Sequence, residues 1–216
     1  MTNLFNIFDP STSLYNIQLN WINTLLTLII MPNFIWILPN RINLAMMFIL
    51  NNLNKEMLML FNKKKIKSPT FIFMNLFMFI FLNNFISLFP YIFSSSSHLT
   101  FSLTLAIPFW LFFIIMSMIK NMKKFIIHLI PLNTPMILTP IMTIIETTSI
   151  FIRPISLSIR LTANLIAGHL LMSLLNFNSL MMIVIIMQMF LMFFELCVAL
   201  IQSYVFSILT TLYSND

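Results

Sequence analysis

The sequence predicts an all-α integral membrane protein, and three observations lead to that fold class. Hydrophobic residues make up 60% of the 216 residues and charged residues only 7%, so the apolar surface exceeds what a soluble domain of this size can bury. Apolar runs long enough to span ~30 Å of hydrocarbon, which takes ~20 helical residues, recur along the chain. Short lysine-rich segments separate some of these runs. Lysines between spans are typical of loops on the non-translocated side of a membrane. The net charge of +6 therefore indicates membrane orientation and not nucleic-acid binding, which would need bases and aromatics interleaved on a soluble surface.

The expected organisation is a single membrane domain over residues 1–216. Its first third comprises one N-terminal span at 21–38, with Trp21 and Trp36 as interfacial anchors near its ends. Residues 42–62 follow, in which polar side chains recur at three- and four-residue steps. That pattern predicts an amphipathic helix lying in the membrane interface, and a poorly apolar second span is the alternative.

A two-span hairpin comes next, with spans predicted at 70–93 and 99–119. The polar sequence SSSSH joins them as a short turn, and its His98 is interpreted as an ordinary loop histidine. All eight lysines fall between Lys55 and Lys67 or between Lys120 and Lys124. Two spans separate these basic segments, so both can face the same compartment, with the N-terminus and the SSSSH turn on the other side.

The last third contains two apolar stretches at 135–175 and 179–213. At 1.5 Å per residue each helix would exceed about 50 Å, well beyond the hydrocarbon thickness of ~30 Å. Pro140 and Pro154 permit bending, but neither is accompanied by a polar loop. We therefore expect two long, steeply tilted helices that form an antiparallel hairpin.

Arg160 is the strongest candidate for function among the charged residues within these stretches, because a charge at a helix centre costs roughly 2.5–3.5 kcal/mol. Arginine keeps its proton at any relevant pH, so it is a fixed positive charge and not a proton carrier. A buried ion pair with Glu146 or Glu195 is the structural alternative. The surrounding helix carries small residues that would let another helix approach closely, namely Ser156, Ala163, Ala167 and Gly168.

Polar residues on the two long helices are expected to meet across the hairpin. His169 lies ~13 Å beyond Arg160 and on the opposite side of the helix, and its titration near neutral pH suits a proton relay. The antiparallel register would bring His169 level with Glu195, and Arg160 level with Gln202. A histidine bonded to a backbone carbonyl is the alternative for His169, and a helix–helix polar contact is the alternative for Asn164, one turn from Arg160.

Glu146 and Arg153 are seven residues apart on one helix face. A simple ion pair is therefore the alternative to a functional role for both residues. Glu146 lies toward the lysine side, whereas His169 lies toward the hairpin tip. The polar residues therefore form two clusters, each opening to one compartment, with Arg160 between them. Protons could cross only if a mobile carrier completed the middle of the path.

These residues resemble a known family. The stretch RPISLSIRLTANLIAGHLL, with IIETTSIFIRP before it and ELCVALIQSYVFSILTTLY near the end, is similar to the a subunits of mitochondrial F-type ATP synthases. NNFISLFP and LAIPFWL resemble the earlier membrane hairpin of that family. Ser87 is a departure, since relatives often have glycine there. The resemblance implies two offset proton half-channels against a rotating ring of c subunits, and a non-hydrolytic, proton-conducting subunit that is not an enzyme on its own.

The resemblance also implies the role of each residue. Arg160 would face the ring carboxylate, with Asn164 and Gln202 as polar neighbours. His169 and Glu195 would form the inlet half-channel, and Glu146 the outlet. Ser156, Ala163, Ala167 and Gly168 are expected to pack against the ring, whereas Arg153 receives no role.

The expected partners are the c-subunit ring, peripheral-stalk and other membrane subunits, and the lipid bilayer; no nucleic acid, cofactor or metal is expected. Residues with A/T-rich codons predominate and the N-terminus carries no targeting signal, which suggests an organelle gene. We therefore expect a multi-pass protein of the mitochondrial inner membrane, with its N-terminus in the intermembrane space and its lysine-rich loops and C-terminus in the matrix. A proton- or ion-coupled secondary transporter and an ion-translocating respiratory-complex subunit are the alternatives, although internal repeats and lysines within the spans are missing.

Overall fold

The computed structural model describes residues 4–12, 17–30, 40–60, 67–89, 91–130, 135–176 and 182–215, and all regular structure within these ranges is helical. Four helices contain apolar stretches long enough to cross a membrane, which are Thr70–Ser87, Leu99–Ile119, Met136–Leu175 and Val184–Leu212. The predicted fold class, an all-α membrane protein, is confirmed.

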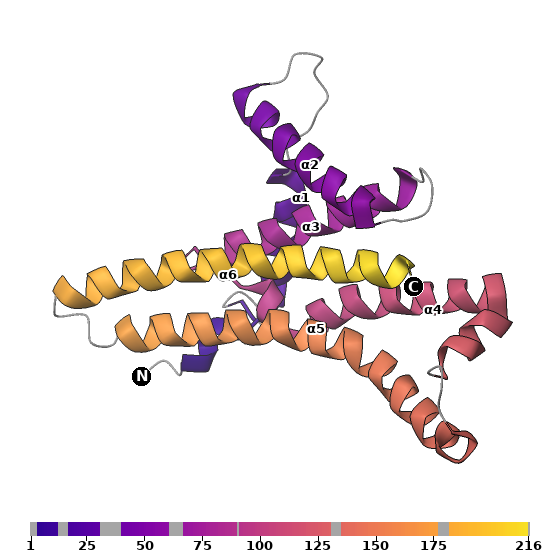
Figure 1. Cartoon of the computed structure of the whole chain (residues 1–216). Coiled ribbons are helices and arrows are strands. Elements are labelled where there is room, and N and C mark those ends of the chain that lie inside the picture. Colours follow the sequence, from indigo (N-terminus) through magenta and orange to yellow (C-terminus); the bar gives the residue numbers. More distant parts are fainter. Residues whose placement is uncertain are drawn as a thin grey trace.

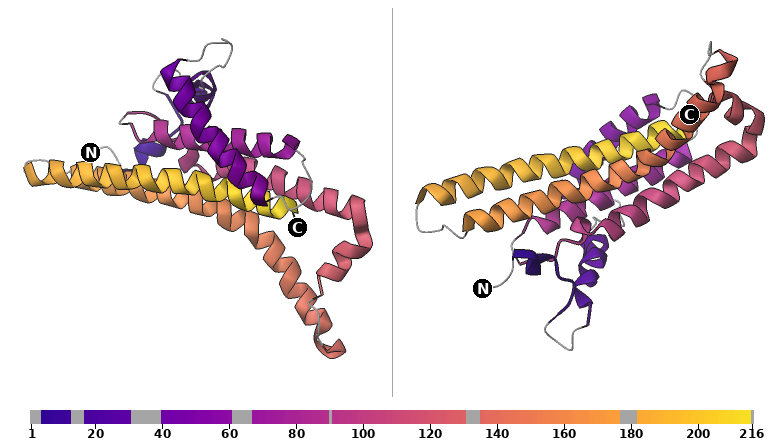
Figure 2. Two further views of the ribbon diagram at one scale, coloured as in Figure 1. Left: turned by 45° about the horizontal axis from the view of Figure 1, so that its top comes forward. Right: turned by 90° about the horizontal axis from the view of Figure 1, so that it is seen from below.

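Two long helices near the C-terminus form the predicted antiparallel hairpin. Helix α5 (Thr139–Asn176) has 38 residues and α6 (Met182–Asn215) has 34, and they run side by side in opposite directions (Figures 1 and 2). The first part of α5 diverges from α6 at a bend (Figure 1), and an internal Pro154 removes one helical hydrogen bond from α5. Lengths of about 57 and 51 Å exceed the hydrocarbon thickness. The tilt of the hairpin in a membrane stays a prediction.

Helices α3 (Lys67–Ser87) and α4 (Leu99–His128) correspond to the predicted two-span hairpin. Helix α3 packs mainly on α6, and α4 packs on α5. Two expected boundaries were wrong. Helix α3 ends at Ser87 instead of continuing to residue 93, and α4 passes through the basic segment 120–124 instead of ending there. Lysine is a good helix former, so α4 continues beyond its apolar stretch without a break.

The N-terminal third is built from short helices. The segments η1 (Leu4–Phe8), η2 (Leu19–Trp21) and α1 (Ile22–Ile30) precede α2 (Arg41–Leu60). Helix α1 covers only the first part of the predicted span at 21–38, and residues 31–38, including Trp36, lie outside the described residues. Helix α2 matches most of the helix expected at 42–62. It crosses α6 at an angle (Figure 2, left) and packs on α3 and α6, while its position in the membrane interface stays a prediction.

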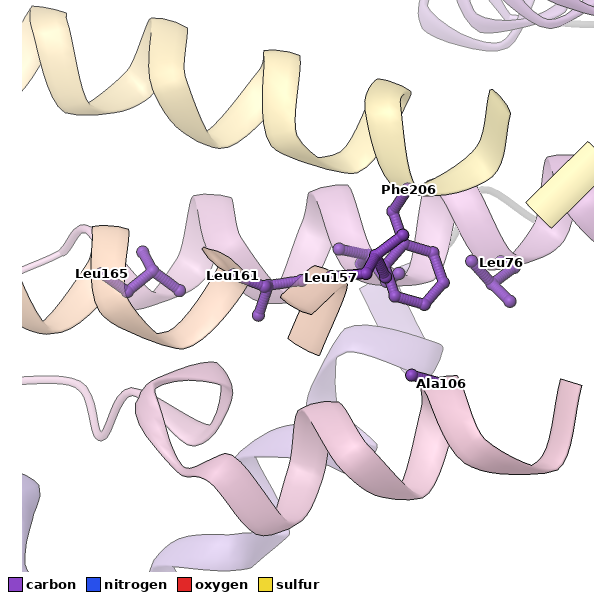
Figure 3. Close-up of a cluster of buried hydrophobic side chains, with 7 residues drawn as sticks. Leu76, Ala106, Leu157, Leu161, Leu165 and Phe206 are labelled. Carbon is purple, nitrogen blue, oxygen red and sulfur yellow. The ribbon is translucent and has the colours of Figure 1, made fainter. Parts of the chain in front are cut away.

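A small hydrophobic core joins the four long helices. Leu157, Leu161 and Leu165 recur at four-residue steps and form one buried stripe of α5. They meet Leu76 and Ile80 of α3, Ala106 of α4 and Phe206 of α6, and Figure 3 shows this row of side chains between the helices. Most other large apolar side chains on α5 and α6 face outward, such as Ile144 at 62% and Phe190 at 73% exposure. An outward apolar surface of this extent suits lipid or partner helices.

The SSSSH turn lies inside the helix bundle, which its sequence did not indicate. The serines are buried, with Ser96 fully inaccessible, and η3 (Ser95–Ser97) packs against α3, α4 and α5. The Ser94 hydroxyl donates a hydrogen bond to Ser97 Oγ at 2.9 Å, and the Ser97 hydroxyl donates one to the Ser94 carbonyl at 2.7 Å. Small side chains that bond locally can pack inside a helix bundle at little cost, so a polar turn need not lie at the surface.

Candidate functional site

Arg160 lies on the outward face of α5, away from the core stripe. Its side chain is exposed, as are those of Ser156, Ala163 and Ala167 on the same face. The Ser156 hydroxyl donates to the Arg153 carbonyl at 2.9 Å and so is satisfied within the helix. Across the described ranges, no carboxylate oxygen comes within 4.0 Å of the Arg160 guanidinium. The alternative of a buried ion pair with Glu146 or Glu195 is therefore not what the fold forms.

Gly168 does not belong to this outward face, which corrects the sequence-based expectation. It is buried in the contact between α5 and α6, where Glu195 lies against it. A Cβ atom built on Gly168 would be 2.7 Å from Glu195 Cδ and 2.8 Å from Glu195 Oε1. The physical reason is angular, because a residue one position beyond Ala167 is rotated by about 100° around the helix. Glycine here makes room for the carboxylate of the neighbouring helix.

Asn164 and Gln202 form a direct contact between the two long helices. The Asn164 side-chain amide donates to Gln202 Oε1 at 3.3 Å, and Gln202 is buried, with 6% exposure. The expected register brought Gln202 level with Arg160, but the observed partner lies one helical turn further along α5. The helix–helix polar contact considered for Asn164 is therefore present, next to the exposed Arg160 face.

His169 and Glu195 lie near the same level of the hairpin, in line with the predicted register. Glu195 rests against Gly168, the residue before His169. No hydrogen bond joins their side chains in the described parts of the chain; His169 Nε2 and Glu195 Oε1 are both buried there without any hydrogen-bond partner. The His169 ring instead meets Phe8 of η1 edge-on, with centroids 6.3 Å apart. Buried polar atoms normally bond to protein or to water, so this region requires ordered water or a further ligand.

Glu146 and Arg153 form the ion pair that was considered from their spacing. Arg153 Nη2 and Glu146 Oε1 are 3.7 Å apart, and the two side chains are 39% and 40% exposed. An ion pair this open contributes at most about 1 kcal/mol. The contact explains Arg153 as a partner of Glu146, whose side chain stays 40% exposed.

Several buried polar groups and one polar contact lie outside the residues expected from the sequence. Both side-chain amide atoms of Asn84 are buried without a partner in the described chain, as are Ser96 Oγ and His98 Nε2. The Tyr204 hydroxyl donates to Glu56 Oε2 at 2.9 Å, which links α6 to α2. Asn84 could have been found from sequence, because an amide within an apolar span is costly. The contact between α2 and α6 has no signal in local spacing.

The arrangement can hold charge and protons at separate depths along one helix. Arg160 lies about 21 Å from Glu146 and about 13 Å from His169 along α5, by helical rise. A fixed positive charge between two titratable groups discourages a proton from passing straight through.

Known proteins share this sequence over nearly its whole length. The profile of the ATP synthase A chain family matches residues 16–215, a range that contains every site residue above except Phe8. The chain is 72% identical over 215 residues to ATP synthase F(0) complex subunit a of Rhopalosiphum padi, covering 100% of this chain and 99% of that protein. It is 47% identical over 223 residues to ATP synthase subunit a of Aedes aegypti and 46% identical over 222 residues to that of Drosophila melanogaster, with the same coverage.

Proposed function

This chain belongs to the ATP synthase A chain family, and from that premise we propose that it conducts protons through two offset half-channels to and from a rotating ring of c subunits. As a subunit of the membrane sector it is non-hydrolytic and contributes no ATP-binding chemistry of its own. Arg160 separates the two half-channels. Arg160 on an outward face of small side chains, without a carboxylate partner in the described chain, is the observation that carries this proposal.

The partner at this face is a helix that carries a carboxylate in the membrane. Ser156, Ala163 and Ala167 allow a neighbouring helix to approach the α5 backbone closely. An arginine beside such a helix stabilises the ionised carboxylate and, because it keeps its own proton, takes none from it. The carboxylate of a c subunit meets both requirements, and it is mobile because the ring rotates.

The inlet half-channel in this proposal contains His169 and Glu195. Their buried, unpartnered atoms call for water next to them, and Gly168 provides the room that the Glu195 carboxylate occupies. Asn164 and Gln202 lie between this region and Arg160, where their amides can orient water or the ring carboxylate. A proton that arrives there neutralises the carboxylate, which then enters lipid at much lower cost.

The outlet half-channel contains Glu146 at the other end of α5. After rotation the protonated carboxylate reaches this side, where Arg160 favours loss of the proton and Glu146 accepts it on its way to water. Arg153 contacts Glu146 at 3.7 Å and has no role in proton transfer in this proposal. Each proton that crosses 100 mV releases about 2.3 kcal/mol, which drives rotation in one direction.

The orientation follows from charge. We place the protein in the mitochondrial inner membrane, with the lysine-rich segments and the C-terminus in the matrix and the N-terminus in the intermembrane space. Peripheral-stalk and other membrane subunits are expected to cover part of the remaining apolar surface, and α2 lies in the matrix-side interface.

The test uses the assembled ATP synthase in sealed vesicles with an imposed proton gradient. Arg160→Ala should abolish proton-driven ATP synthesis while the complex still assembles. Arg153→Ala is the matched control, because it removes an arginine seven residues away on the same helix, and it should retain most activity. Proton-driven synthesis by the Arg160→Ala complex would refute the proposal. A disulfide between a cysteine at Ala163 and a c subunit, in a Cys197→Ser background, would test the partner directly.

A further inference from the structure

The Phe8 side chain of η1 contacts His169 of α5, although the two residues are far apart in the sequence. The Phe8 ring meets the His169 imidazole edge-on, with centroids 6.3 Å apart and planes inclined at 82°. Phe8 is half-buried, and the following Asp9 is exposed. A solvent-facing carboxylate therefore follows directly on the residue that covers the histidine.

Further contacts tie this segment to the helix bundle. The Asn20 side chain donates to the Asp9 carbonyl at 3.4 Å, which fixes the segment to η2. Trp21 of η2 packs on the His98 ring at a centroid distance of 5.3 Å, and the adjoining η3 packs against α5. Asp9 therefore follows directly on the residue that contacts His169, and its carbonyl is bonded to η2.

Water has to reach His169 from outside the chain. His169 Nε2 and Glu195 Oε1 are buried, and the described residues offer no hydrogen-bond partner to either atom. Native proteins bond such atoms to protein or to ordered water. Phe8, which contacts His169, is half-buried, and Asp9 after it is exposed.

Charged side chains are scarce in the segments that the proposed orientation places on the inlet side. Asp9 is the only Asp, Glu, Lys or Arg in residues 1–40, and the sequence has none at 88–98 or 176–181. All eight lysines lie in the segments assigned to the opposite side. A lone carboxylate at a neutral opening attracts cations, including protons, and raises their local concentration.

We propose that the Asp9 carboxylate gathers protons at the mouth of the inlet half-channel and returns them to the water beside His169, while Phe8 covers the imidazole. This inference rests on the proposed function above. In each cycle Asp9 takes a proton from hydronium, leaving water, and then gives it to a water molecule of the passage. The other titratable groups of the surrounding elements are His169 on α5, Glu195 on α6 and His98 after η3.

The experiment measures ATP synthesis by the assembled complex in vesicles as the pH on the inlet side is varied. Asp9→Asn should raise the proton concentration needed for half-maximal rate by about threefold to tenfold at low salt, with the maximal rate unchanged. The difference should shrink in 1 M salt, where electrostatic attraction is screened beyond about 3 Å. A purely structural role would lower the maximal rate at every salt concentration.

Two controls separate charge from structure. Asp9→Glu should behave as the unaltered chain, and Asn6→Asp should recover proton dependence in the Asp9→Asn background, because Asn6 is exposed on the same turn. In a Cys197→Ser background, Asp9→Cys modified with an anionic thiol reagent should outperform the same variant modified with a cationic one.

The inference is overturned if Asp9→Asn leaves the proton dependence unaltered, or if neither relocated charge recovers it. Failure of the proposed function is distinguishable, since it would appear as coupled synthesis by the Arg160→Ala complex. An inactive Arg160→Ala complex together with a fully normal Asp9→Asn complex would refute the role of Asp9 alone.

Discussion

Gly168→Ala tests the contact on which the inlet half-channel depends. The added methyl group would lie 2.7 Å from Glu195 Cδ, 2.8 Å from Glu195 Oε1 and 3.1 Å from Glu195 Cγ. Favourable carbon–carbon contact begins near ~3.5 Å, so the carboxylate carbon has to move by roughly 0.8 Å. The colliding atoms belong to the flexible end of a side chain, and the helices themselves can therefore stay in register.

The expected result is a functional defect with little loss of assembly. A displacement near 1 Å of a group that exchanges protons can reduce a rate by up to about a hundredfold. We expect Gly168→Ala to lower proton-driven ATP synthesis by about tenfold or more in vesicles, while the amount of assembled complex stays close to normal. Ser173→Ala is the matched control, because it changes one atom on the same helix and the Ser173 hydroxyl is already satisfied within α5 by the Leu170 carbonyl at 2.8 Å.

A second substitution, at Glu195, separates the steric effect from other effects of Gly168→Ala. Glu195→Asp shortens the side chain by one methylene group and withdraws the carboxylate from the new methyl group. The double variant Gly168→Ala with Glu195→Asp should therefore be more active than the product of the two single effects predicts. A fully active Gly168→Ala complex, or single effects that simply multiply, would show that the close approach of Glu195 to Gly168 has no part in proton transfer.

Two further predictions concern the contacts on either side of Arg160. Asn164→Leu and Gln202→Leu each remove the 3.3 Å amide contact, which is worth about 1 kcal/mol net; each should lower proton flux by about fivefold, and the double variant should be no worse than the worse single one. Glu146→Gln should lower proton release about tenfold, whereas Arg153→Gln should stay within about twofold, because a half-exposed ion pair contributes little. Equal effects of Glu146→Gln and Arg153→Gln would mean that Glu146 serves only the ion pair. Both sets are measured as passive proton conduction through the membrane sector.

The helical architecture was largely predictable from the sequence. The apolar stretches at 70–93, 99–119, 135–175 and 179–213 each correspond to a long helix, because lipid leaves a spanning chain few alternatives to an α-helix. The boundaries were less predictable. The lysines at 120–124 mark the end of an apolar stretch but not of a helix, since a helix leaving the membrane can continue in water.

The site residues were likewise predictable only in part. Arg160 and the small residues Ser156, Ala163 and Ala167 share one face by helical spacing alone, and the structure leaves that face exposed. Gly168 looked like part of the same surface because it is small. In the structure Gly168 instead packs against Glu195 of α6. No residue spacing within α5 could reveal that contact.

The sequence by itself determined the class of the protein, its long helices, the cost of Arg160 in an apolar stretch and the antiparallel register to within about one turn. These features depend on composition and on helical periodicity, which are local properties of the chain. Only the tertiary structure decided that Glu195 packs on Gly168, that the SSSSH turn is buried and that Phe8 covers His169. Such contacts join residues far apart in sequence, and they depend on how whole helices rotate and pack against one another, which a pattern within one helix does not encode.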